Sequence, residues 1–143
     1  MDGNESILAC AKHYIGYGEA VGGRDACDTE MTYRKLRDVF LPPFEQAIEA
    51  GCATVMTAYG SIDGTPFTAS EKTLKTILRD ELGFDGLVVT DWDNVNSLVE
   101  RQHVAADLDE ASLLAAEAGN DMIMTTTAFY ESAIRLVRSG RMP

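Results

Sequence analysis

The chain has 143 residues, of which 45% are hydrophobic and 24% charged, a composition typical of a globular protein with a core of its own. Its 12 Lys and Arg against 23 Asp and Glu leave a formal net charge of −11, which argues against a nucleic-acid-binding protein, because such proteins carry a basic stripe. No apolar run approaches the roughly 20 residues that span a bilayer, so we expect neither nucleic acid nor a membrane as a partner.

The first predicted elements are a strand, a glycine-rich loop and an interrupted helix. Residues 7–13 begin as a short apolar run that is typical of a buried strand, and four glycines follow in the loop over 16–28. Thr32 is placed to cap a helix. Pro42-Pro43 should kink or break this helix, because proline lacks the backbone N–H and clashes with the preceding turn, and the helix is expected to resume up to Ala50.

Three more strands alternate with helices in the rest of the chain. We expect Ser70 to cap the next helix, Gly83 to end it and Asp109 to cap a later one. The expected elements are strands over 53–58, 87–90 and 121–124, and helices over 70–82, 95–100, 109–118 and 128–138.

This alternation predicts an α/β fold of four consecutive βα units, with a parallel sheet and helical crossovers. Four such units form either a small doubly wound sheet or half of an eight-stranded (β/α)8 barrel, and periodicity alone does not choose between them. In both architectures the active site lies beyond the carboxyl ends of the strands.

Polar and aromatic residues follow three of the predicted strands. Lys12 and His13 end the first strand, Tyr59 follows the second, and Asp91 and Trp92 follow the third. These groups should converge on one rim of the sheet. They include one carboxylate, and the sequence contains no GxSxG nucleophile elbow, so carboxylate chemistry is the enzyme class that the pattern favours.

Each of these residues also has an ordinary structural interpretation. Lys12 fits a solvated strand end, His13 a hydrogen-bonded core histidine, and Asp91 a helix cap. Asp93 is the better candidate for that cap, since it stands just before the next helix. Trp92 fits either the core or a surface on which a sugar ring stacks.

The cysteines and histidines indicate no metal site and no cofactor. Cys10, Cys27 and Cys52 are odd in number and widely spaced, which is typical neither of a disulfide framework nor of a zinc site. The only histidines, His13 and His103, lie far apart in the sequence and outside any HExxH motif. Free cysteines fit a reducing compartment, and with no signal peptide visible we expect a cytoplasmic protein.

Four segments carry a family resemblance, and together they extend over nearly the whole chain: AKHYIGYGEAVGGRD (11–25), LRDVFLPPFEQAIEAG (36–51), LRDELGFDGLVVTDW (78–92) and AGNDMIM (118–124). They resemble glycoside hydrolase family 3, in its β-glucosidase and β-xylosidase branch. The resemblance implies that residues 1–143 are part of the N-terminal (β/α)8 barrel domain of a longer enzyme, whose second domain, an α/β sandwich, is absent here.

The resemblance also implies roles for the residues at the strand ends. Asp91, in a TDW motif where the family more often has SDW, matches the nucleophile of a retaining β-glycosidase. Lys12 and His13 match a pair that binds the sugar, Tyr59 matches an aromatic hydroxyl near the nucleophile, and Trp92 matches a wall of the pocket. The implied substrates are oligosaccharides or aryl and alkyl β-glycosides with a terminal β-D-glucosyl or β-D-xylosyl residue.

The second catalytic group, the acid/base, has no clear counterpart in this sequence. Tyr17 stands where the resemblance places a histidine in the N-acetylglucosaminidase branch, and Glu19 is an unlikely substitute. In the glucosidase branch the acid/base is a glutamate of the second domain. We therefore expect this chain alone to be almost inactive, and its open barrel edges to favour self-association.

A non-catalytic alternative remains open at this point. Small flavodoxin-like binding or regulatory modules also place an aspartate such as Asp91 at a strand end. Lys12-His13 and the long glycine-rich loop argue against such a module, since a receiver-type domain needs neither.

Overall fold

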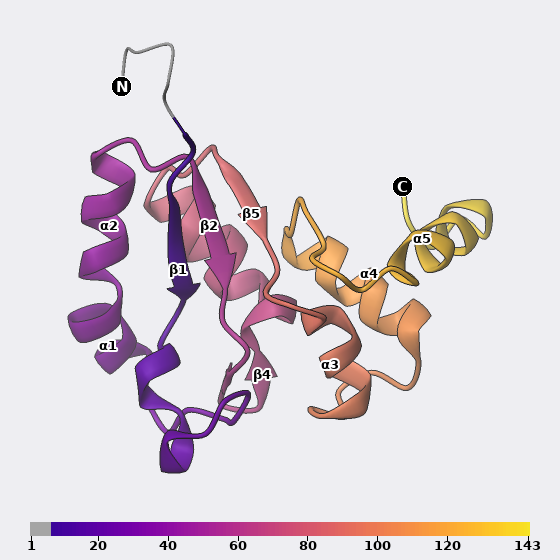
Figure 1. Cartoon of the computed structure of the whole chain (residues 1–143), viewed down its shortest axis with the longest axis horizontal. Helices are drawn as coiled ribbons and strands as arrows, with labels where there is room; N and C mark the ends of the chain where they lie inside the picture. Colours follow the sequence, from indigo (N-terminus) through magenta and orange to yellow (C-terminus); the bar gives the residue numbers. More distant parts are fainter. Residues whose placement is uncertain (1–6) are drawn as a thin grey trace.

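The computed structural model describes residues 7–143 and contains a three-stranded parallel sheet in the order β1-β2-β5 (Figure 1). The peptide bonds Lys12–His13 and Tyr14–Ile15 are cis. Val55 in the central strand pairs with Ala11 in one parallel neighbour and with Val88 in the other. The predicted parallel α/β fold is therefore confirmed. The three strands are β1 (Cys10–Tyr14), β2 (Thr54–Thr57) and β5 (Leu87–Val89).

The fourth predicted strand is reduced to a single parallel bridge between Val89 and Met122. The carboxylate of Asp121 accepts hydrogen bonds from the backbone N–H of Val88 and from Arg79, both at 2.7 Å. The backbone N–H groups of Asp121 and Met122 both donate to the Val88 carbonyl. The segment thus lies beside β5, but a side chain takes the place of a regular ladder of backbone bonds.

The first helical layer follows the prediction closely. The hydroxyl of Thr32 accepts a hydrogen bond from the N–H of Lys35 at 3.2 Å, as a cap should. Leu41 keeps helical φ and ψ angles of −76° and −40° between the two segments, and the two prolines form the first turn of the next helix, where a missing N–H costs nothing. The layer consists of α1 (Tyr33–Lys35), the π-helical segment η3 (Leu36–Phe40) and α2 (Pro42–Glu49).

The remaining elements complete the units after β2 and β5. Ser70 accepts a hydrogen bond from the N–H of Thr73, and Gly83 has a positive φ of 65°, so both predicted helix ends are confirmed. These elements are β3 (Ser61–Ile62), β4 (Thr65–Pro66), η4 (Phe67–Ala69), η5 (Lys72–Glu81), α3 (Asn94–Glu100), α4 (Leu108–Ala118) and α5 (Phe129–Arg138), and the loop after β1 contains η1 (Tyr17–Glu19) and η2 (Val21–Gly23).

The predicted cap of α4 is wrong. Asp107, not Asp109, accepts the hydrogen bond from the N–H of Glu110, at 2.9 Å. Asp109 lies inside the helix, and its carboxylate instead binds Arg135 of α5. Sequence position alone does not reveal this pairing, because it depends on how the two helices pack.

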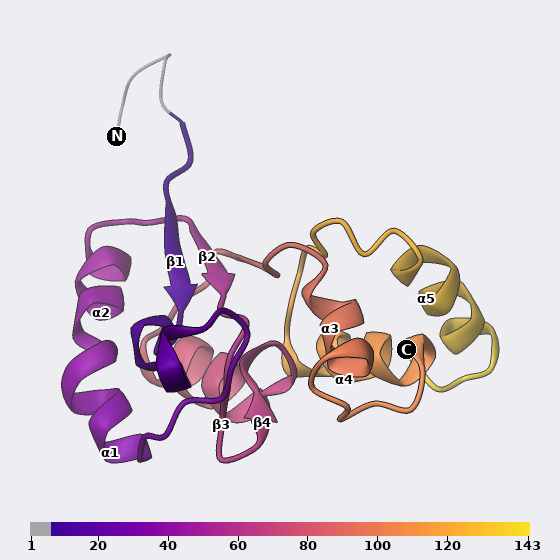
Figure 2. The ribbon, with the colours of Figure 1, turned by 60° about the horizontal axis from the view of Figure 1, so that its bottom comes forward.

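Two hydrophobic clusters hold the layers together. One surrounds the sheet and joins it to α2 and η5, and the other lies among α3, α4 and α5, which form a group beside the sheet (Figure 2). None of the helices described for residues 7–143 is long and apolar enough to cross a bilayer.

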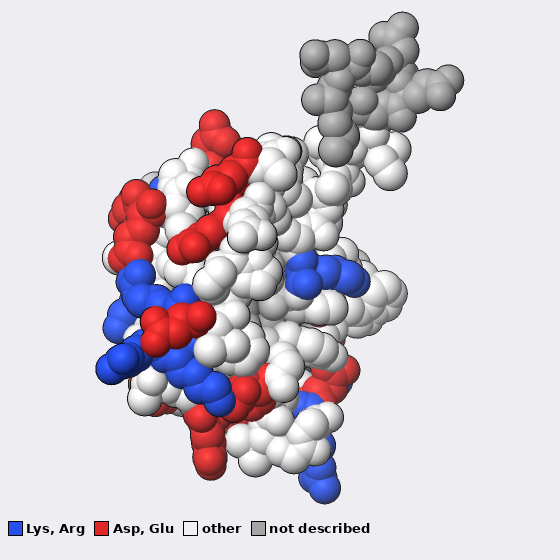
Figure 3. Space-filling model, turned by 90° about the vertical axis from the view of Figure 1, so that its left-hand side faces the viewer, with Lys and Arg blue, Asp and Glu red and all other residues white. Residues whose placement is uncertain are grey.

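Charges of both signs are interspersed on the face that Figure 3 shows. Arg34 pairs with Asp38 within the first helical layer, and Arg37 of the same layer pairs with Glu81 at the end of η5. Basic groups on this layer are thus locally matched by carboxylates.

Candidate functional site

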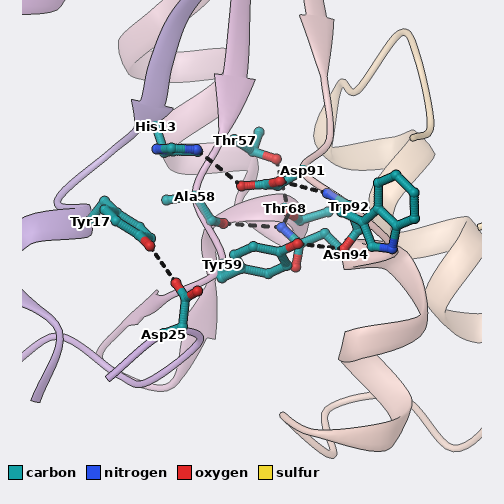
Figure 4. Close-up of polar contacts among 10 residues, drawn as sticks. All are labelled: His13, Tyr17, Asp25, Thr57, Ala58, Tyr59, Thr68, Asp91, Trp92 and Asn94. Carbon is teal, nitrogen blue, oxygen red and sulfur yellow. Dashed lines mark hydrogen bonds and ion pairs between the residues drawn. The ribbon is translucent and has the colours of Figure 1, made fainter. Parts of the chain in front are cut away.

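Three strand ends bring the predicted site residues to one rim of the sheet (Figure 4). His13 lies on β1, Tyr59 lies two residues beyond β2, and Asp91 lies two residues beyond β5. The strands run in parallel, so their carboxyl ends meet on the same side. Of the predicted residues, the structure groups His13, Tyr59, Asp91 and Trp92.

The Asp91 carboxylate has a protein neighbour at each oxygen. Its Oδ1 accepts a hydrogen bond from the backbone N–H of Trp92 at 2.7 Å, and its Oδ2 lies 3.3 Å from Nε2 of His13. The side chain is 13% exposed, so it is oriented by the protein while remaining open to a ligand.

The capping interpretation of these carboxylates does not hold. The N–H of Asn94 in the first turn of α3 binds the backbone carbonyl of Asp91, not its side chain. Asp93 stands at the cap position of α3, but its carboxylate accepts hydrogen bonds from the side chains of Thr126 and Asn96. The side chain of Asp91 therefore makes no capping hydrogen bond to α3.

Tyr59 approaches the nucleophile candidate from β2. Its hydroxyl donates to the carbonyl of Trp92 at 2.6 Å. Burial, and then the neighbouring charge of Asp91, raise the pKa of Tyr59 to about 12. The phenol therefore stays protonated near neutral pH and keeps its single hydrogen on the Trp92 carbonyl, which leaves the phenol oxygen as an acceptor beside Asp91.

Trp92 is not a core residue, since 64% of it is exposed. It borders a hollow of about 400 Å³ that also involves Leu108 and the segment over 125–128. Figure 4 shows its indole turned away from His13. The ring is thus available as a stacking surface, but on the far side of Asp91 from the imidazole.

Lys12 is exposed on β1 and is not drawn into this group. Among residues 7–143, no carboxylate lies within 4 Å of its Nζ atom. Lys12 therefore forms no direct ion pair with Asp91. Its role toward a sugar stays a prediction.

Sequence reasoning missed two residues of the loop after β1 as members of this group. The ring of Tyr17 packs on His13, with centroids 4.7 Å apart, and its hydroxyl donates to Oδ1 of Asp25 at 2.5 Å. This hydrogen bond raises the pKa of Tyr17. The fold of the loop brings Tyr17 and Asp25 together, and no pattern in the sequence predicts this pair.

The buried side-chain amide of Asn94 links the segments that carry the site. Asn94 is 1% exposed, and its Nδ2 donates to the carbonyl of Ala58 at 3.2 Å and to the hydroxyl of Thr68 at 2.6 Å. Thr68 in turn bonds the hydroxyl of Thr57 at 3.1 Å. The end of β2 is thereby tied to the start of α3, which fixes the backbone three residues after Asp91.

Comparisons with known proteins agree with this geometry. The family model described as "Glycosyl hydrolase family 3 N terminal domain" matches residues 1–143. "Lysosomal beta glucosidase" of Dictyostelium discoideum is 39% identical over 141 residues, which is 96% of this chain and 17% of that protein. "Beta-xylosidase" of Formosa agariphila is 43% identical over 117 residues, which is 81% of this chain and 16% of that protein.

Solved structures give the same result. A β-glucosidase involved in saponin metabolism from intestinal bacteria superposes with a TM-score of 0.92 at 47% identity, over 96% of this chain and 18% of that one. The β-glucosidase of Listeria innocua in complex with glucose superposes with a TM-score of 0.91 at 34% identity, over 95% of this chain and 19% of that one. The chain thus spans less than a fifth of the length of these proteins.

Proposed function

The chain belongs to glycosyl hydrolase family 3, and on this premise we propose that it supplies the nucleophile side of a retaining β-glycosidase site. The observation that carries the proposal is the Asp91 carboxylate at a strand end, oriented by the Trp92 N–H and facing His13. The names of the relatives support a terminal β-D-glucosyl or β-D-xylosyl residue as the group transferred.

The chemistry assigns Asp91 the first displacement. A carboxylate oxygen of Asp91 attacks the anomeric carbon and forms an ester to the sugar, while the bond to the leaving oxygen breaks and that oxygen takes a proton from an acid. Water then attacks the same carbon, gives a proton to the conjugate base and releases Asp91. The configuration at the anomeric carbon is retained because it is inverted twice.

The neighbouring groups have roles in binding. His13 and Lys12 hold sugar hydroxyls, and bonds that tighten in the oxocarbenium-like transition state accelerate the reaction. Tyr59, protonated near neutral pH, holds the backbone carbonyl of Trp92 next to the nucleophile, and Trp92 offers an apolar ring face to the C–H groups of the substrate.

The acid/base belongs, in this proposal, to a part of the protein outside residues 7–143. A retaining site needs its two carboxyl groups about 5–5.5 Å apart. Glu19, the loop candidate, is instead ion-paired with Lys35. We accordingly propose that the 143-residue chain is part of a longer barrel enzyme and has little activity alone. Family membership argues against the flavodoxin-like module.

The experiment uses the product of the complete reading frame that contains this chain, assayed on aryl β-glucoside and aryl β-xyloside. We expect Asp91→Asn to lower kcat at least about 1000-fold, because the amide is no longer a nucleophile. Asp93→Asn is the matched control, since this neighbouring carboxylate binds only protein groups. Turnover by Asp91→Asn within tenfold of the unmodified enzyme contradicts the proposal.

A further inference from the structure

The imidazole of His13 is supported by an aromatic ring from the loop that follows its own strand. The centroids of His13 and Tyr17 are 4.7 Å apart, and the ring planes are tilted by 33°. The same imidazole that packs on Tyr17 has its Nε2 atom 3.3 Å from the carboxylate of Asp91. The orientation of the imidazole relative to Asp91 therefore depends on where Tyr17 sits.

Tyr17 has a tether at its far end. Tyr17 is 41% exposed, so packing alone leaves its side chain freedom to move, but its hydroxyl donates to Asp25 at 2.5 Å. A hydrogen bond to a charged acceptor is stronger than one between neutral groups. The tyrosine is thus fixed at both ends, by the imidazole and by the carboxylate (Figure 4).

Backbone contacts on either side of Asp25 close the loop that carries it. Ala20 forms an antiparallel bridge with Thr29, and Thr29 donates from both its N–H and its hydroxyl to the carbonyl of Ser61. Gly16 turns the chain directly after β1 with a φ of 77°, and a Cβ at this position would lie 2.4 Å from Met31. Asp25 is therefore held across a closed loop from Tyr17.

We propose that Tyr17, anchored by Asp25, is a positioning residue that sets the orientation of the His13 imidazole toward Asp91 and the sugar. This role rests on the proposed glycosidase function. The contacts of Tyr17 with His13 and Asp25 do not depend on that function. Tyr17 acts through His13 and takes no part in bond making. Loss of its anchor loosens His13 and weakens hydrogen bonds that matter most in the transition state.

A double-mutant cycle tests the anchor in the product of the complete reading frame. Tyr17→Phe keeps the ring and removes only the hydroxyl, so folding is preserved, and Asp25→Ala removes the acceptor. We expect each to lower kcat/KM roughly tenfold, mostly through kcat, because misplacement of a binding group costs rate. The double variant should be no worse than either single one, since both remove the same contact. Asp28→Ala, on the same loop, is the control.

The NMR signals of the His13 side chain provide the second measurement. We expect the imidazole ¹H–¹⁵N correlations to shift in Tyr17→Phe and Asp25→Ala but not in Asp28→Ala, with the melting temperature unchanged. Additive losses in the cycle, or unmoved His13 signals, overturn the positioning role. Failure of the proposed function gives a different result: Asp91→Asn stays active, while the His13 signals still report whether Tyr17 positions the ring.

Discussion

The Nε2 atom of His13 on β1 lies 3.3 Å from Oδ2 of Asp91 beyond β5, although these two strands are not neighbours in the sheet. β2 separates β1 from β5, and two strand spacings amount to about 9.5 Å. The side chains therefore meet above the end of the central strand. This contact defines the site, because it joins the first and third βα units at one point.

The pKa of Tyr59 reports on the charge of Asp91. Burial and then that charge raise it to about 12. A raised pKa in the folded state adds stability that is fully present below pH 10 or so and is lost as the pH rises through about 12. In Asp91→Asn we expect the pKa to fall but to stay above 10, because burial remains.

A titration of ¹³Cζ-labelled tyrosine by NMR measures this pKa. Asp109→Asn, which removes a carboxylate on α4, serves as the control and should leave Tyr59 unchanged. An unaltered Tyr59 pKa in Asp91→Asn contradicts the electrostatic link between the two residues.

Gly86 is required by close packing at the start of β5. A Cβ there would lie 2.3 Å from the carbonyl oxygen of Ala53 and 2.7 Å from the ring of Phe84. We expect Gly86→Ala to destabilise the fold by about 1–3 kcal/mol through overpacking, as measured by urea denaturation. Gly18→Ala, with open space around its Cβ, should have little effect. Equal denaturation midpoints for the two variants rule out this explanation.

Arg79 holds the segment that leads into β5. Its guanidinium donates to the carbonyls of Phe84 and Gly86 and to the carboxylate of Asp121. Removal of these charge-assisted bonds in Arg79→Ala should cost about 2–3 kcal/mol. Arg34→Ala, which breaks an exposed pair, should cost less than about 0.5 kcal/mol. Chemical denaturation measures the free energy of unfolding of both variants. A similar loss of stability in the two variants refutes the role of Arg79.

The free edge of β1 predicts self-association of the 143-residue chain. Within residues 7–143, β1 pairs only with β2, and beside it lies an apolar hollow of about 620 Å³ bordered by exposed Ile7 and Leu8. An unpaired edge of this kind offers free backbone N–H and C=O groups with which a second copy of the chain can pair. Sedimentation velocity should detect dimers or larger species that Leu8→Lys reduces. Val137→Lys, on α5, should not reduce them, and a monomer at every concentration contradicts the prediction.

Local signals in the sequence were enough to predict much of the framework. The apolar runs predict the three strands of the sheet, and β2 and β5 are partly to fully buried over most of their length, as such runs should be. The expectation of a buried first strand is wrong, because this segment lies at the edge of the described sheet and is mostly exposed over 7–13. Thr32 and Ser70 were found as caps, because capping depends on neighbouring residues alone. His13, Tyr59 and Asp91 were found because strand ends converge in any parallel sheet.

Features that depend on tertiary contacts could not be predicted from the sequence. The fourth strand was overpredicted, because the Asp121 side chain replaces part of its ladder. Asp109 was taken for a cap, because its partner Arg135 lies on another helix. The Tyr17–Asp25 pair was missed, because only the folded loop brings the two side chains together.

Trapping the glycosyl-enzyme tests the central claim most directly. The product of the complete reading frame is inactivated with a 2-fluoro β-glucoside, digested, and analysed by peptide mass spectrometry. The account predicts one sugar per chain, attached to Asp91, and protection by a competing glucoside. A sugar attached to any other residue, such as Asp25 or Asp93, contradicts it.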